Sequence, residues 1–76
     1  MAHTFEDLVT LERAAEQAHA QLLTAADPDT ARAAWIQASA AFQAAVTEYA
    51  AATEGESRVE VEMRVKRAVR HPEGDA

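Results

Sequence analysis

The sequence predicts an all-α fold in which two long helices form an antiparallel hairpin and a shorter third helix follows. Apolar residues recur at helical spacing along most of the 76 residues, and 20 residues are alanine, the strongest helix former. The two glycines and two prolines lie between the predicted segments or near the C-terminal end, so they interrupt no helix. Because the chain has no cysteine and little large apolar surface, we expect residues 1–76 to form one small domain that assembles as a homo-oligomeric helical bundle.

The first helix is predicted over residues 4–26. Thr4 and Asp7 match a capping box, in which a hydroxyl accepts a hydrogen bond from an unpaired backbone N–H and a carboxylate lies near the positive end of the helix. From Leu8 to Ala25, apolar residues follow at alternating spacings of three and four, which is the pattern of a coiled-coil seam.

The second helix is predicted over residues 28–53. Pro28 suits the first position of a helix, Asp27 is the predicted N-cap, and Gly55 can end the segment in the left-handed conformation. One stripe of this helix alternates aromatic and methyl-sized side chains. The stripe comprises Ala31, Trp35, Ala38, Phe42, Ala45, Tyr49 and Ala52.

The short connection forces these two helices to fold back on each other, so that their apolar stripes meet in one packing seam. In the expected register Trp35 lies near Ala18 and Ala38 lies near Ala15, so large side chains face small ones. The predicted seam residues are Leu8, Leu11, Ala15, Ala18, Leu22, Ala31, Trp35, Ala38, Phe42, Ala45 and Tyr49.

Several large apolar residues do not belong to this seam. A two-helix hairpin cannot bury them together with the seam, so either the third helix or another subunit must cover them. These residues are Phe5, Val9, Leu23, Ile36 and Val46.

The C-terminal segment fits two structures. Apolar and charged residues alternate over 59–65, which is the pattern of a strand. Ser57 with Glu60 matches a capping box, and both Glu60–Arg64 and Glu62–Lys66 have the i,i+4 order that supports a helix. We favour a third helix over 57–70, because a lone strand would need a second subunit for pairing.

We expect this helix to end at the dipeptide His71-Pro72, because proline cannot continue it. The last residues, 72–76, are predicted to fray.

Charge is distributed unevenly along the acidic chain, whose net charge is −6. Residues 1–56 carry nine acidic side chains and two arginines, whereas residues 57–71 have a net charge of +3. The third helix is therefore a candidate surface for an acidic protein partner. The candidate partner-binding residues are Arg64, Lys66, Arg67 and Arg70.

Two other roles for these cations are consistent with the sequence. Together with Arg58 they could contact the phosphates of a nucleic acid, which makes a small nucleic-acid-binding regulator the alternative function. They could also pair, within the bundle, with the acidic residues of the first helix. Those acidic residues are Glu6, Asp7, Glu12 and Glu16.

A candidate set of metal ligands lies on the first helix. Glu12, Glu16 and His19 share one face, and the Glu16-x-x-His19 spacing resembles the Glu-x-x-His motif of ferritin-like di-iron carboxylate proteins. This resemblance implies a di-metal site built by a symmetric dimer. Such sites need further glutamates, and the second helix offers only Glu48, near the other end of the hairpin. We therefore expect no metal site and no cofactor, and interpret these residues as a solvated flank of the seam. A di-metal carboxylate protein that uses Glu12, Glu16 and His19 is the second alternative function.

No catalytic motif is evident, because the chain lacks cysteine, a glycine-rich phosphate loop and a recognisable serine–histidine pair. No segment approaches the roughly 20 apolar residues of a membrane span. Glu6 and Asp7 come early, where a leader would be basic, so we expect no membrane contact and a cytoplasmic location. The expected function is a non-enzymatic scaffold or regulatory module that acts through protein–protein contacts, oligomerisation and a basic C-terminal helix.

Overall fold

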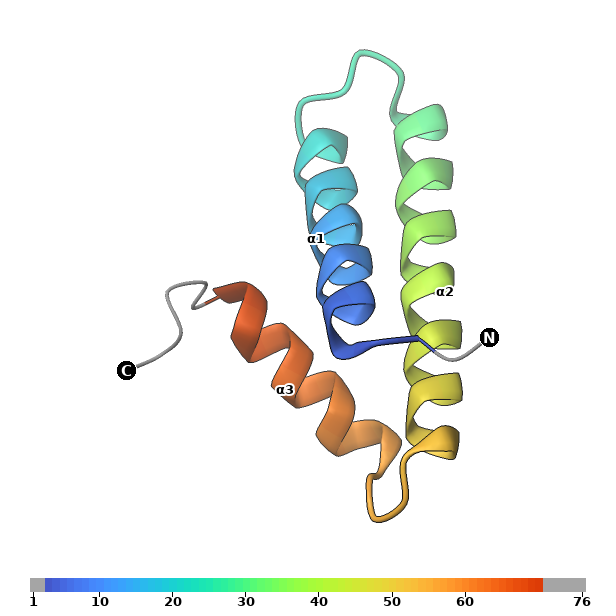
Figure 1. Cartoon of the computed structure of the whole chain (residues 1–76). Coiled ribbons are helices and arrows are strands. Elements are labelled where there is room, and N and C mark those ends of the chain that lie inside the picture. The colour runs from blue at the N-terminus through green and yellow to red at the C-terminus, as the bar shows by residue number, and fades with distance from the viewer. Residues whose placement is uncertain (1–2, 71–76) are drawn as a thin grey trace.

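The computed structural model describes residues 3–70, which form three helices and, within that range, no strand (Figure 1). Helices α1 (Phe5–Leu22) and α2 (Pro28–Ala52) run antiparallel, and α3 (Arg58–Arg70) lies obliquely beside the end of the hairpin where α1 begins and α2 ends. The predicted all-α class is confirmed, and the alternative strand over 59–65 is wrong. The predicted stop at His71-Pro72 and the predicted fraying of 72–76 lie outside the described residues.

Local capping interactions begin each of the first two helices where the sequence predicts. The Asp7 backbone N–H donates to the Thr4 hydroxyl (3.1 Å) and the Thr4 backbone N–H donates to the Asp7 carboxylate (2.9 Å), which completes a capping box. The hydrogen bond from the Thr4 backbone lowers the pKa of Asp7. At α2, Asp27 accepts from the hydroxyl and the backbone N–H of Thr30, and these two bonds lower the pKa of Asp27.

The turn between α2 and α3 also forms as the sequence indicates. Gly55 adopts a φ of 83°, in the left-handed region that glycine reaches without steric cost. Ser57 then accepts a hydrogen bond from the Glu60 backbone N–H (3.1 Å) and so caps the first turn of α3. This cap and the packing described below decide in favour of a helix, although the same residues alternate like a strand.

The first helix ends at Leu22, four residues before the predicted end at Ala26. The backbone N–H groups of Leu23 and Thr24 bond to carbonyls three residues earlier, so the last turn is tightened and then stops. The physical reason is that the chain must reverse direction and reach an extended residue before Pro28. Residues 23–27 are used for this reversal.

The hydrophobic core occupies only one half of the hairpin, where all three helices meet. Each helix contributes fully buried apolar side chains, and α3 supplies two valines spaced by one helical turn. The core residues are Leu8, Phe42, Ala45, Val46, Val61 and Val65. Toward the turn between α1 and α2 the seam consists mainly of alanines, so most of the apolar stabilisation comes from the end that α3 covers.

The residues of the predicted seam are all buried or half-buried. Two ring pairs report the register of the hairpin: Phe5 with Tyr49 (centroids 6.5 Å apart) and His19 with Trp35 (4.7 Å). Both pairs agree with the register expected from the connection. Trp35 is only half-buried, however, and Ala52 at the end of the stripe is exposed.

Helix α3 covers part of the apolar surface that lies off the seam. Phe5 and Val9 are half-buried against the core, and Val46 is fully buried within it. In contrast, Leu23 is 75% exposed and Ile36 is 58% exposed. The third helix therefore covers one end of the hairpin and leaves apolar side chains uncovered at the other.

None of the helices within residues 3–70 is both long enough and apolar enough to cross a membrane.

The confined core makes a prediction about stability. Leu8→Ala should lower the free energy of unfolding by about 2–5 kcal/mol, because it leaves a cavity where three helices meet. Leu23→Ala makes the same chemical change at an exposed position and should cost less than about 0.5 kcal/mol in dilute protein. Urea denaturation followed by circular dichroism measures both values. Similar losses at the two positions would contradict the placement of the core.

Candidate functional site

Five cations lie on α3, and three of them are used inside the molecule. Arg58 ties the first turn of α3 to α2: its Nε donates to the Thr47 hydroxyl (3.1 Å), and its guanidinium also donates to the side-chain oxygen of Gln43. A longer contact of 3.9 Å joins Arg58 to Glu62 within α3. Because its guanidinium is hydrogen-bonded to α2, Arg58 holds the first turn of α3 against α2.

Lys66 joins α3 to α1. Its Nζ donates to the Glu12 carboxylate at 3.1 Å and lies 5.4 Å from the centre of the Phe42 ring. Glu12 is only 3% exposed although the hairpin places it next to solvent-facing residues, because α3 covers it. Burial raises the pKa of Glu12, and the ammonium of Lys66 opposes that shift. The ammonium also satisfies the carboxylate that the fold has removed from water.

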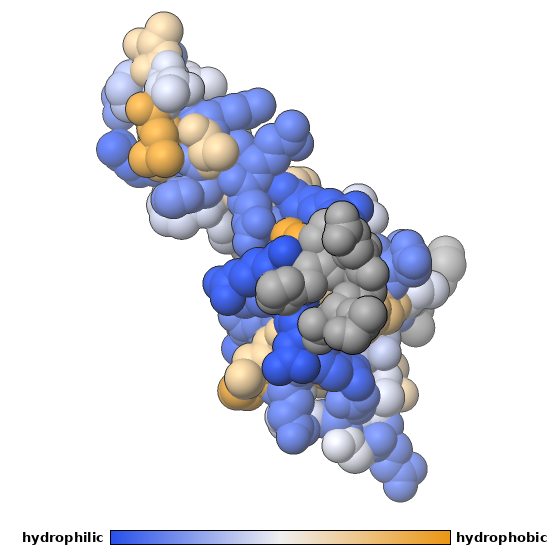
Figure 2. Space-filling model, turned by 90° about the vertical axis from the view of Figure 1, so that its left-hand side faces the viewer, coloured by the Kyte–Doolittle hydropathy of each residue, from blue (hydrophilic) through white to orange (hydrophobic). Residues whose placement is uncertain are grey.

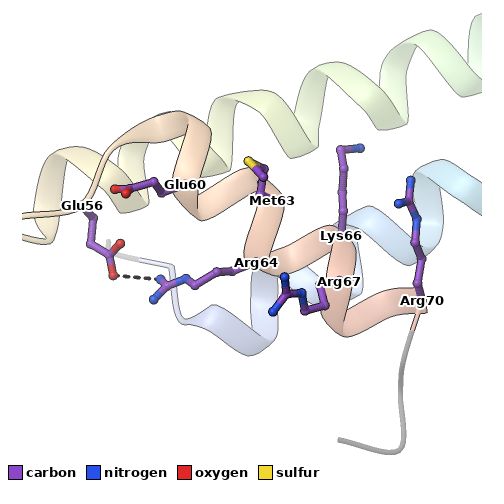
Figure 3. A pocket seen from close by; sticks show the side chains of 7 residues that line it. All are labelled: Glu56, Glu60, Met63, Arg64, Lys66, Arg67 and Arg70. Carbon is purple, nitrogen blue, oxygen red and sulfur yellow. Dashed lines mark ion pairs between the residues drawn. The ribbon is translucent and has the colours of Figure 1, made fainter. Parts of the chain in front are cut away.

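Arg64 makes the third internal contact. Its guanidinium pairs with Glu56 at 2.8 Å, and it lies 5.5 Å from the centre of the Phe5 ring (Figure 3). The pair connects the loop before α3 to the second turn of the helix. Arg64 is half exposed, so the pair contributes modestly to stability and mainly orients the side chain.

The i,i+4 pairs predicted within α3 are wrong. Among the described residues Arg64 pairs with Glu56 instead of Glu60, and Lys66 pairs with Glu12 instead of Glu62. For Lys66 the pair with Glu12 prevails because burial strengthens this contact relative to a more exposed pair along one helix. The interpretation that cations of the third helix pair with acidic residues of the first is confirmed for this one pair.

Arg67 and Arg70 remain, and neither has an ion pair within residues 3–70. They share a face of α3 with Val59 and Met63, because the four residues are spaced by four, four and three. Val59 is 63% exposed and Met63 is 64% exposed. We call these four residues the outer face of α3.

A shallow groove of about 580 Å³ runs along this part of α3. Its lining combines Met63 with four cations and two carboxylates: Arg64, Lys66, Arg67, Arg70, Glu56 and Glu60 (Figure 3). In Figure 3 the side chains of Lys66 and Arg70 extend to one side of the helix and that of Arg67 extends to the other. The groove therefore has a net positive lining beside one exposed apolar side chain, Met63. Of the four predicted partner-binding residues, the structure leaves Arg67 and Arg70 with their charges uncompensated among the described residues.

The residues considered as metal ligands do not converge. No group of three His, Cys, Asp or Glu side chains within residues 3–70 has the geometry to hold a metal ion. The Glu12 carboxylate is held by the ammonium of Lys66, while Glu48 is bonded to His3 (2.9 Å) near the opposite end of α1. Glu12, Glu16 and His19 all line a second groove, on the hairpin.

This second groove, of about 490 Å³, lies between α1 and α2 beyond the end of the surface that α3 covers. We call it the hairpin groove. Its apolar lining comes mainly from Leu23 and Trp35, its polar lining includes Glu16 and His19, and Lys66 borders it. Figure 2 shows apolar surface at the turn end of the hairpin, separated by hydrophilic residues from a second apolar patch lower on the molecule.

Sequence reasoning missed the hairpin groove, because it assigned Trp35 to a closed seam. The available signal was Leu23, which lies off the seam and which the sequence leaves for the third helix or another subunit to cover. Comparison with protein-family models, with curated proteins and with solved structures found no match.

The pKa of Glu12 gives a prediction about pH. The folded chain binds the proton of Glu12 more tightly than the unfolded chain does, because the pKa of Glu12 is raised on folding. Protonation of Glu12 therefore contributes fully to the free energy of unfolding below the unfolded pKa, near 4.5. This contribution to stability is lost as the pH rises through the folded pKa. Stability of the wild type relative to Glu12→Gln should therefore increase as the pH falls from about 7 to about 5. Urea denaturation across this range measures the difference, and a pH-independent difference would contradict it.

Proposed function

We propose that this chain is a non-enzymatic helical module that binds protein surfaces through the outer face of α3, and that self-association is part of its role. The observation that carries the proposal is that some cations of α3 have partners within the molecule and others do not. Arg58, Lys66 and Arg64 have partners within the molecule, whereas Arg67 and Arg70 lie beside exposed apolar side chains.

The chemistry of the outer face fits a protein better than a nucleic acid. Methionine and arginine are enriched at protein interfaces, where an exposed apolar centre is buried and a charged margin selects the partner. Met63 and Val59 supply such a centre, and Arg67 and Arg70 supply the margin. Binding to a phosphate backbone requires cations and no apolar centre. The alternative of nucleic-acid binding also relies on all five cations of α3, three of which have partners within the molecule.

A non-enzymatic role is supported by the titratable side chains whose pKa values are shifted. Asp7 and Asp27 cap helices, and Glu12 is buried in an ion pair with Lys66 of α3. Each of these shifts therefore has a structural cause. Shifted groups that converge in a cleft would favour catalysis instead.

Photo-cross-linking in living cells tests this proposal. With Met63 replaced by p-benzoylphenylalanine, the chain should form covalent adducts with protein, because position 63 lies at the centre of the outer face. Charge reversal by Arg67→Glu and Arg70→Glu in the same chain should reduce those adducts about tenfold or more.

The matched control places the same photo-reactive residue at Gln37, which is exposed on α2. It should give few adducts. Equal labelling from the two positions, or adducts at position 63 that nuclease digestion removes, would contradict the proposal.

A further inference from the structure

The surface that would complement the outer face of α3 is present on the same molecule. The outer face combines exposed apolar side chains with Arg67 and Arg70. The hairpin groove combines Leu23 and Trp35 with the carboxylate of Glu16, and it is also lined by Lys66, whose charge is paired with Glu12. In the groove, Leu23 is 75% exposed and Trp35 is half-buried, and Glu16 has no ion pair within residues 3–70. Both surfaces therefore expose apolar side chains, and Glu16 on one could pair with Arg67 or Arg70 on the other.

We propose that the partner of the outer face is a second copy of this chain, with α3 of each copy docked in the hairpin groove of the other. This inference rests on the function proposed above and names the partner of that surface. The occupant of each groove is a helix that already exists in the structure, so docking requires no refolding.

The net charges of the two segments also favour this arrangement. The hairpin and its loops, residues 3–56, carry nine acidic side chains and two arginines, whereas α3 has a net charge of +3. Within one molecule, α3 already satisfies Glu12 through Lys66. Arg67 and Arg70 are both exposed, and neither forms an ion pair with its own hairpin within residues 3–70.

Geometry favours a symmetric pair. Lys66 lines both the groove along α3 and the hairpin groove, so the two complementary surfaces adjoin each other. A two-fold axis that passes near this border brings the outer face of each copy onto the groove of the other at the same time. An interface of this kind is closed, because each copy uses both of its surfaces.

The same arrangement accounts for part of the apolar surface that α3 leaves uncovered. Docking would bury Leu23 and the open edge of Trp35 on one copy against Val59 and Met63 on the other. It would also place Glu16 opposite Arg67 or Arg70. The half of the hairpin that contributes little to the monomer core would then gain its apolar contacts from the dimer.

Charge exchange between two variants tests the proposal. Sedimentation velocity should show that the wild type dimerises, and that Glu16→Arg or Arg67→Glu alone weakens the dimer about tenfold or more, because like charges then meet twice across the interface. An equimolar mixture of the two variants should recover dimers, since each altered charge then faces its complement. Tryptophan fluorescence reports the same event, because the single Trp35 lines the groove and its emission should shift to shorter wavelength on docking.

Two variants with the same change in net charge serve as controls. Glu54→Arg and Arg13→Glu alter exposed residues that line neither groove, and they should dimerise like the wild type. Circular dichroism verifies that every variant remains helical. A wild type that is monomeric at all concentrations would overturn the proposal, and so would single variants that dimerise normally or a mixture that stays monomeric.

These results are distinguishable from failure of the proposed function. Purified chain that is monomeric, combined with protein adducts from position 63 to a different protein in cells, would overturn the dimer and leave the function in place. Adducts between two copies of the chain, lost with Glu16→Arg, would support both.

Discussion

The ion pair between Lys66 and Glu12 is the contact on which the arrangement of the molecule depends. It joins the third helix to the first at the border of the core, and it supplies a partner for a carboxylate that is only 3% exposed. Without the ammonium, closure of α3 over α1 would bury an unpaired acid. The ion pair and the packing of Val61 and Val65 therefore act together. Burial of the valines drives the docking of α3, and the ion pair fixes the position of α3 along α1.

Docking of α3 divides the molecule into two regions with different properties. Where the three helices meet, large apolar side chains are buried and the fold is stabilised. Toward the turn of the hairpin, the two helices meet mainly through alanine, and Leu23 with Trp35 forms an open groove. The same docking engages three of the cations of α3 and turns Arg67 and Arg70 outward. The docking of α3 thus determines both where the fold is stabilised and which surfaces are left open for binding.

Features set by neighbouring residues were predictable from the sequence, whereas features set by tertiary contacts were not. Thr4, Asp27 and Gly55 mark helix ends correctly, because caps and left-handed turns depend on a few adjacent residues. The end of α1 was placed too late, because chain reversal before Pro28 has no local signal of its own. The sequence allows Lys66 to pair either with Glu62 or with the acidic residues of the first helix, and it cannot decide between them, because the burial that favours Glu12 is a tertiary effect.

A double-mutant cycle on Lys66 and Glu12 tests the account most directly. Lys66→Met and Glu12→Gln should each lower the free energy of unfolding, and the double variant should lose less than the two losses combined, by about 0.5–3 kcal/mol. The exposed pair of Arg32 with Asp29 (3.5 Å) is the reference, and its coupling should be near zero. Additive losses for Lys66 and Glu12, or a coupling no larger than that of the exposed pair, would contradict a fold organised around this contact.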